Sequence, residues 1–511
     1  MDWEDKMKTL KGILYLILIT IITPVLILGV LLVTYSEAAL PKTNEIIVKY
    51  KNAAFTDVLF HQASMTSDAF VIRMHARKNL KLKKEFSAFQ MYGFEVSENE
   101  NMEDLISELY KDPNIEFAEP NYEVQATRYA VSTVDFKPKT SLAVTGTEDL
   151  TEYANPAILV AVVDTGVDYT HTALKSKMYT HKNEIPGDGI DNDKNGFIDD
   201  VMGWDFAANT PDAYDDNGHG THVAGIIAGV SEYSQNKSGN YKIIPLKFLD
   251  ADGYGTTMGA ISAIEYGLRV GVKVFNNSWG GGGFSLALHD VVTQTYQAGA
   301  LFVAAAGNSS QDIDEEPAYP ASYEHPNVLT VAAVDAFGSL AWFSNFGKKG
   351  VDVAAPGVNI YSSLPENKYG SLSGTSMATP YVTRMATLMM DENRGLSAFQ
   401  VKDIIMQTVK KNTELKETSA SEGAVDGEEA LKVASETAGN DSVPPYNNGA
   451  VLNEFLDENG SEKVDATPKG CAFVDDGNPP TDFMTLFSSL LSFLMLYVLI
   501  FGPIKLCVRR R

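Results

Sequence analysis

Four side chains in the sequence could together catalyse acyl transfer, and each is expected where a strand ends or a helix begins. They are Asp164, which closes an apolar segment, His219 and Ser376, which each open a predicted helix, and Asn308, which follows a second apolar segment. A serine hydroxyl is a weak nucleophile and needs a base such as histidine within hydrogen-bond reach. The imidazole needs a buried carboxylate that fixes its tautomer, and the charge developing on the substrate needs a preorganised donor. Together the four residues supply one of each group.

Each of these residues also has a plainer interpretation when it is considered alone. An aspartate at a strand end and a serine at a helix N-cap are usually structural. His222 is expected to pack inside its helix rather than to act as a second base. Met377 is expected in the core, where sulfoxide formation is a liability. The four residues in this order, however, make coincidence remote.

The motifs around the four residues carry a family resemblance. They are Ala161–Asp168, Asn217–Gly225, Ala304–Asn308 and Leu372–Pro380. These segments resemble the motifs of the subtilisin-like serine proteases (subtilases), whose triad runs in the order Asp, His, Ser. The resemblance covers roughly residues 43–436. It implies a serine endopeptidase with an Asp164–His219–Ser376 triad and with Asn308 as the oxyanion donor.

The segment from about residue 157 to residue 436 alternates apolar runs with helical patterns. The helical stretches include 257–269 and 285–298, and the apolar runs are 158–163, 242–248, 272–275, 300–306 and 328–334. Buried β-branched strands that alternate with helices predict an α/β fold with a mostly parallel sheet covered on both faces. The resemblance specifies this unit as a three-layer α/β/α subtilisin-like catalytic domain over residues 135–436. Functional residues of such sheets collect at the carboxyl ends of strands.

Residues 43–126 predict a small α+β unit that precedes the catalytic domain. Strands are expected at Glu45–Tyr50 and Gln90–Val96, and a helix at Met102–Tyr110. The unit resembles the subtilase prodomain, which implies that the chain carries its own chaperone and inhibitor. The resemblance places its last strand, near residues 121–126, in the active cleft like a product. A cut within 122–135 would release the mature enzyme, and the sequence does not specify the bond.

Two further segments resemble the substrate-binding parts of the family. Asn276–Gly281 resembles the strand that pairs with the substrate backbone through the main chain of Ser278 and Gly280. Trp279 either lines apolar subsites or fills the core. Because the opposite wall, Ala305, Ala306 and Gly307, is uncharged, we expect broad cleavage after large or apolar P1 side chains.

An acidic loop, Asp188–Asp200, is the best metal candidate. Asp191, Asp193 and Asn195 alternate as in the first half of a calcium loop, and Gly196 supplies the sharp turn. The loop is not an EF-hand, because Met202 stands where a bidentate glutamate is required. Asp199 or Asp200 could close the site, and Asp188 could join it. The alternative is a solvated acidic loop, but the resemblance favours structural Ca²⁺, which many subtilases carry.

Both ends of the chain predict membrane segments. The uncharged run 12–34 follows Lys6, Lys8 and Lys11, and its length spans about 30 Å of hydrocarbon, with the amino terminus cytoplasmic. Residues 1–39 are therefore a signal peptide or an uncleaved signal anchor. An acidic linker, 437–481, leads to a transmembrane segment at 483–504 and a basic cytoplasmic tail at 505–511. The second segment is either an anchor or a sorting signal that is later removed, with Cys471 as a guess for its processing site.

The net charge of −25 argues against a nucleic-acid partner. The sequence as a whole predicts a secreted or surface-tethered serine endopeptidase, synthesised as a self-processing zymogen, that acts on proteins or peptides outside the cell. A selective proprotein-processing protease fits less well, because the linker is too short for the β-rich domain that usually follows its catalytic domain. An inactive subtilase fold used as a binding module conflicts with the complete set of catalytic residues. A structural membrane-linking protein would explain only the two ends.

Overall fold

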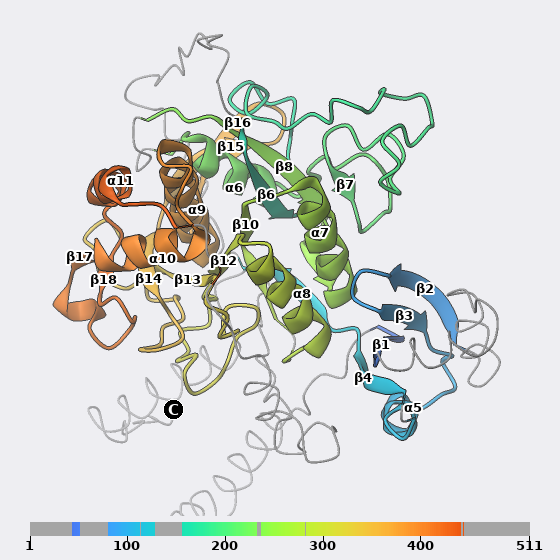
Figure 1. The fold of residues 1–511 in the computed structure, drawn as a ribbon. Helices are drawn as coiled ribbons and strands as arrows, with labels where there is room; N and C mark the ends of the chain where they lie inside the picture. The colour runs from blue at the N-terminus through green and yellow to red at the C-terminus, as the bar shows by residue number, and fades with distance from the viewer. Residues whose placement is uncertain are drawn as a thin grey trace, which may run out of the picture.

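The computed structural model describes residues 43–51, 80–112, 114–127, 156–231, 237–281, 283–440 and residue 443. Two bodies are visible, a small amino-terminal sheet and a larger α/β domain (Figure 1). Both predicted membrane segments, the cytoplasmic tail and nearly all of the acidic linker lie outside the described residues. Within the described ranges, no helix combines the length and apolar character needed to cross a membrane.

The larger body is built on a nine-stranded sheet in the order β17-β18-β14-β13-β12-β10-β6-β8-β7. Neighbouring strands run parallel except for β17 and β18. The strands are β6 (Ile158–Asp164), β7 (Trp204–Asp205), β8 (Tyr241–Lys247), β10 (Val274–Asn277), β12 (Leu301–Ala305), β13 (Val328–Val334), β14 (Val353–Pro356), β17 (Lys410–Lys411) and β18 (Gly423–Ala424). A mostly parallel sheet was expected from the continuous apolar runs, and β13 is buried at every position.

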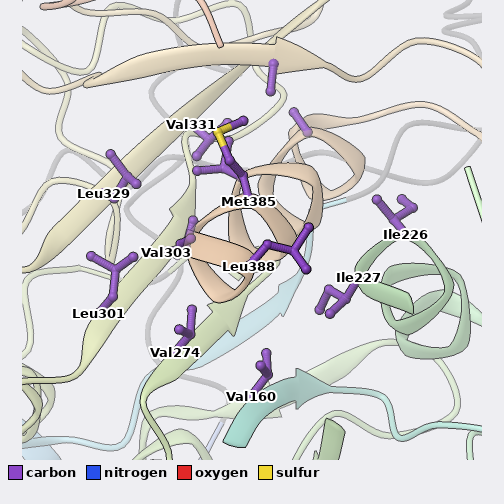
Figure 2. Close-up of a cluster of buried hydrophobic side chains, with 14 of the residues drawn as sticks. Val160, Ile226, Ile227, Val274, Leu301, Val303, Leu329, Val331, Met385 and Leu388 are labelled. Carbon is purple, nitrogen blue, oxygen red and sulfur yellow. The ribbon is translucent and has the colours of Figure 1, made fainter. Parts of the chain in front are cut away.

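Helices cover both faces of this sheet, as the alternation of strand and helix predicts. On one face lie α6 (His219–Ala228), α9 (Thr375–Glu392), α10 (Ala398–Gln407) and α11 (Gly427–Glu436), and on the other lie α7 (Thr257–Val270) and α8 (Leu286–Gln297). Alternate residues of each strand enter separate cores. Val160 packs under α6 and α9, whereas Ala161 packs under α7 and α8. Figure 2 shows the first core, where Val160, Val274 and Leu301 lie on the strands and Met385 and Leu388 lie on α9.

The element boundaries differ slightly from those predicted, for local reasons. β10 begins at Val274 rather than Val272, because Val272 still donates its N–H to Gly267 and so completes the end of α7. Ser285 is the N-cap of α8 rather than its first residue, since its side chain accepts the N–H of Leu288. A hairpin of β15 (Ile360–Leu364) and β16 (Lys368–Leu372) and the short 3₁₀ helix η2 (Thr413–Leu415) complete the domain.

The smaller, amino-terminal body is an antiparallel sheet in the order β2-β3-β1-β4 with one helix. Its elements are β1 (Glu45–Tyr50), β2 (Lys81–Phe86), β3 (Met91–Glu95), α5 (Met102–Leu109) and β4 (Ile115–Pro120). The α+β class and three of these elements match the sequence predictions. β2 was missed because its charged sequence hides the strand pattern. One face of the sheet packs on α5, and the other joins the core under α7 and α8.

A third sheet joins the two bodies. Strand β5 (Glu123–Ala126) lies between β9 (Tyr254–Thr256) and β11 (Trp279–Gly280), antiparallel to both. The strand that follows the amino-terminal sheet in the sequence therefore becomes the middle strand of a sheet whose outer strands belong to the larger domain.

Candidate active site and acidic loop

Asp164 and His219 meet because two backbone segments approach closely. Asp164 is the last residue of β6, and His219 is the first residue of α6. A Cβ atom added to Gly220 would lie only 2.1 Å from the carbonyl oxygen of Gly166, which follows Asp164. The absence of a side chain at Gly220 thus lets the start of α6 sit directly on the end of β6.

The Asp164–His219 pair has the geometry expected of a carboxylate that orients a base. His219 Nδ1 lies 2.7 Å from Asp164 Oδ1, and both side chains are fully buried. The same carboxylate oxygen accepts the N–H of Thr165 at 2.7 Å. His219 Nε2 has no hydrogen-bond partner among the described residues. This arrangement leaves Nε2 as the nitrogen that can accept a proton.

Ser376 lies in the first turn of α9 and is fully buried. Its Oγ donates to the carbonyl oxygen of Ser278 at 3.1 Å and also contacts the carbonyl oxygen of Thr127, the residue after β5. The hydroxyl of Thr127 lies 2.6 Å from Ser376 Oγ. The serine hydroxyl is therefore directed to the residue that follows β5, and within the described part of the chain no hydrogen bond joins it to His219.

Asn308 has one end of its amide fixed and the other end free. Its Oδ1 accepts hydrogen bonds from the N–H and the hydroxyl of Thr375, both at 2.9 Å. Its Nδ2 is buried and has no partner among the described residues. Thr375, which holds this amide, directly precedes Ser376 in the chain. An amide oriented in this way can donate to a developing oxyanion.

The sequence analysis missed Asp215, a buried carboxylate that hydrogen-bonds residues flanking Asp164 and His219. Its carboxylate accepts from the hydroxyls of Thr165 and Thr221 at 2.8 and 2.6 Å, and from the N–H groups of Gly218 and Thr221 at 2.8 Å each. Thr165 in turn accepts the N–H of Gly220 at 2.9 Å. Burial raises the pKa of Asp215 above its usual value. The only sequence signal was its place just before the His219 motif.

The predicted substrate strand holds β5 through its main chain. Ala126 pairs with Trp279 and Gln125 with Gly280, and the carbonyl of Ser278 accepts the N–H of Thr127 at 3.0 Å. The Trp279 ring is fully buried and packs edge-on against Phe248, which is the core alternative left open by the sequence.

The opposite wall lies at the end of β12. Ala305, Ala306 and Gly307 are buried there, and the N–H of Gly307 donates to the hydroxyl of Thr375 at 3.2 Å. Across the described residues, no hydrogen bond joins these three residues to β5. Two of the other side chains have the expected places, since His222 and Met377 are both fully buried.

The acidic loop brings together a different set of carboxylates from the predicted one. Glu184, Asp193 and Asp200 have ligand atoms within 4.8 Å of one another. Asn195 donates to Asp200 at 2.8 Å, so three of the five predicted residues converge. Glu184 was missed because it precedes the alternating motif.

The remaining two predicted residues face backbone amides. Asp188 accepts the N–H of Ile190, and Asp191 accepts those of Asn195 and Gly196. Their oxygens hold the shape of the loop, and they do not join the cluster of Glu184, Asp193 and Asp200.

The cluster carries buried oxygens without compensation. Glu184 Oε2 and Asp200 Oδ1 are buried and have no hydrogen-bond partner among the described residues. Around the other oxygens of the cluster, His181 Nδ1 lies 3.3 Å from Asp193 and the Tyr266 hydroxyl donates to Asp200 at 2.6 Å. Carboxylate oxygens left in this state fit a hard cation such as Ca²⁺.

Comparison with models of known protein families identifies the family of this chain. The model of the subtilase family matches residues 155–427, more than half of the chain, and that of the fervidolysin N-terminal prodomain matches residues 33–121. The chain belongs to the subtilase family. The resemblance to subtilisin-like serine proteases with a prodomain is therefore confirmed, and the protein is a peptidase of that type.

Several named proteins are similar to this subtilase. The thermophilic serine proteinase of Bacillus sp. (strain AK1) is 36% identical over 331 residues, which are 62% of this chain and 73% of that protein. The cell wall-associated protease of Bacillus subtilis (strain 168) is 32% identical, over 72% of this chain and 41% of that protein. Subtilisin-like protease 2 of Plasmodium falciparum (isolate 3D7) is 34% identical, over 55% of this chain and 21% of that protein. A solved structure of a cold-adapted subtilisin-like serine proteinase is 32% identical, with a TM-score of 0.42, over 53% of this chain and 87% of that chain. The chain thus spans less than half the length of the second and third proteins.

Proposed function

We propose that this subtilase is a serine endopeptidase made as a self-processing zymogen, with Ser376 as nucleophile and His219 as its base. The observation that carries the proposal is the buried Asp164–His219 pair, combined with a serine hydroxyl that contacts a peptide carbonyl. Because Asp164 holds Nδ1, the Nε2 nitrogen is left to take the serine proton and return it to the leaving amine.

The amide of Asn308 is proposed as the oxyanion donor. Its Oδ1 is fixed by Thr375, so the amide does not need to reorient when charge develops on the substrate carbonyl. A preorganised donor of this kind stabilises the transition state more than the ground state.

The prodomain is proposed to inhibit the enzyme until it is removed. Its strand β5 occupies the place of a substrate strand between β9 and β11. Its body is held by the carboxylate of Glu119, which accepts from Ser285, Leu286 and Ala287 at the start of α8. Lys49 adds ion pairs with Glu116 of the prodomain and Asp290 of α8. A peptide cannot pair with β11 while this strand is in place.

The substrates are proposed to be proteins or peptides with uncharged P1 side chains, apolar or large ones included. This proposal rests on the uncharged residues Ala305, Ala306 and Gly307 at the end of β12 and on Gly280 opposite. A charged P1 group would lose its hydration there without gaining a partner.

Structural Ca²⁺ is proposed at the acidic loop, held by Glu184, Asp193 and Asp200, with Asn195 beside them. The unpartnered oxygens of Glu184 and Asp200 support a cation there. When bound, the ion would stabilise the fold by neutralising carboxylates that repel one another, and it takes no part in peptide hydrolysis.

The catalytic domain is proposed to act outside the cell, tethered to the membrane or surface or released from it. The charge pattern around the apolar segments 12–34 and 483–504 supports this topology. The similar Bacillus subtilis protein is named for the cell wall, which agrees with an exported enzyme.

Hydrolysis of a peptide library by the purified full chain tests the function. We expect cleavage that is lost in Ser376→Ala and retained in Ser373→Ala, a serine three residues earlier whose hydroxyl accepts the N–H of Asn359. If neither the wild type nor Ser373→Ala cleaves any peptide after removal of the prodomain, the binding-module alternative replaces the enzyme. A strict requirement for a basic P1 residue would contradict the proposed specificity.

A further inference from the structure

The end of strand β5 meets the nucleophile at one residue, Thr127. Ala126 and Gln125 are engaged by the main chain of β11, and the N–H of Ala126 donates to the carbonyl of Gly253 at 2.9 Å. Thr127 is the first residue whose carbonyl oxygen contacts Ser376 Oγ. Its own N–H is held by the carbonyl of Ser278 at 3.0 Å. The main-chain register therefore places the acyl group of Thr127, and not that of a preceding residue, at the serine.

The side chain of Thr127 occupies a narrow, buried slot beside Gly280. A Cβ atom added to Gly280 would lie 3.7 Å from the Thr127 methyl group, and one added to Gly253 would lie 3.6 Å from Ala126 Cβ. Thr127 is only 5% exposed, and its hydroxyl also donates a hydrogen bond to the carbonyl oxygen of Ser278 at 3.2 Å. A small β-branched side chain thus fills the position directly before the nucleophile.

We propose that the chain cleaves itself on the carboxyl side of Thr127, with the Thr127 side chain in the S1 subsite. This inference rests on the proposed peptidase function and names the processing site. Ser376 Oγ forms an ester with the carbonyl carbon of Thr127 while its proton passes to His219. The bond from that carbon to the nitrogen of residue 128 breaks, and the amine leaves with the proton from His219. Water then hydrolyses the ester, which frees Ser376 and leaves a Thr127 carboxylate.

The register also assigns the neighbouring subsites. With Thr127 at P1, Ala126 is P2 and Val124 is P4. Val124 is almost fully buried and belongs to the same apolar cluster as Phe248 and Trp279. The chain's own processing sequence thus combines a small β-branched P1 residue with an apolar P4 residue, a narrower pattern than an uncharged pocket alone predicts.

Mapping the new amino terminus of the mature protein tests the site. The full chain is expressed as wild type and as Ser376→Ala, new amino termini are chemically labelled, and the fragments are weighed by mass spectrometry. We expect a mature fragment that begins at Arg128 in the wild type and none in Ser376→Ala. A Ser376-dependent terminus at any other residue overturns the assignment, and so does a terminus at Arg128 that persists in Ser376→Ala.

Two substitutions at Thr127 test separately whether the hydroxyl group and the uncharged character of its side chain matter for self-cleavage. Thr127→Val keeps the shape and removes the hydroxyl, so we expect the same cleavage bond. Thr127→Asp places a charge in an enclosed uncharged slot, so we expect self-cleavage about tenfold slower or worse. A cut that moves to another bond in Thr127→Val, or an unchanged rate in Thr127→Asp, contradicts the proposal.

The outcomes also separate this inference from the proposed function. If the wild type hydrolyses added peptides through Ser376 but its prodomain is cut elsewhere, only the processing site is wrong. If no Ser376-dependent hydrolysis of any peptide occurs, the peptidase function itself fails.

Discussion

Two buried carboxylate sites lie in different regions of the larger domain: Asp215 beside the active site, and the cluster of Glu184, Asp193 and Asp200 in the acidic loop. They differ in how many of their oxygens accept hydrogen bonds. Behind the active site, Asp215 accepts hydrogen bonds from two hydroxyls and several N–H groups. In the acidic loop, Glu184, Asp193 and Asp200 face one another, and two of their buried oxygens have no partner among the described residues. Both sites are largely removed from water, but the protein's donors satisfy Asp215, whereas they leave two oxygens of the loop cluster without a partner among the described residues.

This difference distinguishes a carboxylate that holds the protein's own groups in place from carboxylates that can bind a cation. A buried carboxylate that is fully hydrogen-bonded fixes the groups around it, and Asp215 fixes Thr165, Gly218 and Thr221 on both sides of the Asp164–His219 pair. Carboxylates that repel one another and lack donors cost free energy unless a cation joins them. The first arrangement supports catalytic geometry, and the second favours an ion.

The largest effect is expected from Asp164→Asn, which changes the charge of the Asp164–His219 pair but hardly its shape. The amide cannot hold His219 in the correct tautomer, so kcat should fall about 10⁴-fold. The melting temperature should change little. Steady-state kinetics and thermal unfolding, both measured after an added protease has removed the prodomain from wild type and variant alike, give the two quantities. A loss of less than about tenfold would show that Asp164 does not orient the base.

Removal of calcium should affect the acidic loop and leave the catalytic pair intact. At about 100 times the Kd, a bound ion adds about 2.7 kcal/mol to the free energy of unfolding. A chelator should therefore lower the melting temperature by about 5 °C or more. The shift should disappear in Glu184→Gln and persist in Glu324→Gln, an exposed carboxylate in another loop. If the chelator left the wild-type melting temperature unchanged, the acidic loop would not bind a stabilising cation.

Asp215→Asn should give an intermediate effect, because the amide replaces an acceptor oxygen by a donor. Its NH₂ group must then face hydrogen-bond donors such as the Thr221 N–H, which costs about 2 kcal/mol of stability. Peptide hydrolysis should fall less than in Asp164→Asn, and the melting temperature should fall more. If Asp215→Asn changed neither quantity, the saturated network would not support the site.

Much of this architecture could be predicted, and the remainder depended on contacts between distant residues. The apolar runs located the main strands. The motifs predicted a site made of Asp164, His219 and Ser376, and the fold brings Asp164 and His219 into hydrogen-bond contact. Short elements such as β7, β17 and β18 have no detectable pattern at two residues each. Alternating acids suggested Asp188 and Asp191 as ligands, which stays a prediction; in the folded loop both carboxylates accept backbone N–H groups, and they lie outside the cluster of Glu184, Asp193 and Asp200. Glu184 and Asp215 acquire their roles only when the folded chain surrounds them.

The smallest effect concerns a third kind of buried group, a histidine kept neutral beneath the prodomain. His289 on α8 lies against His325, with ring centroids 4.4 Å apart, and next to the Lys49–Asp290 ion pair. Burial and the nearby Lys49 lower the pKa of His289 to about 4, and burial and His289 lower that of His325 to about 3.

The sign of the pH dependence follows from these directions. In the unfolded chain a histidine binds a proton below about pH 6.5, whereas His289 in the folded chain stays neutral until about pH 4. The free energy of unfolding should therefore fall as the pH drops through this window, by at most about 1.4 kcal/mol per pH unit for each histidine. His289→Leu keeps an apolar contact with Phe284 and removes one titrating group, so its stability should fall less steeply. Denaturant unfolding of the uncleaved Ser376→Ala zymogen at pH 6.5 and pH 5, with and without His289→Leu, measures the two slopes. Equal slopes would show that His289 binds its proton in the folded chain as readily as in the unfolded chain, so that burial does not keep it neutral.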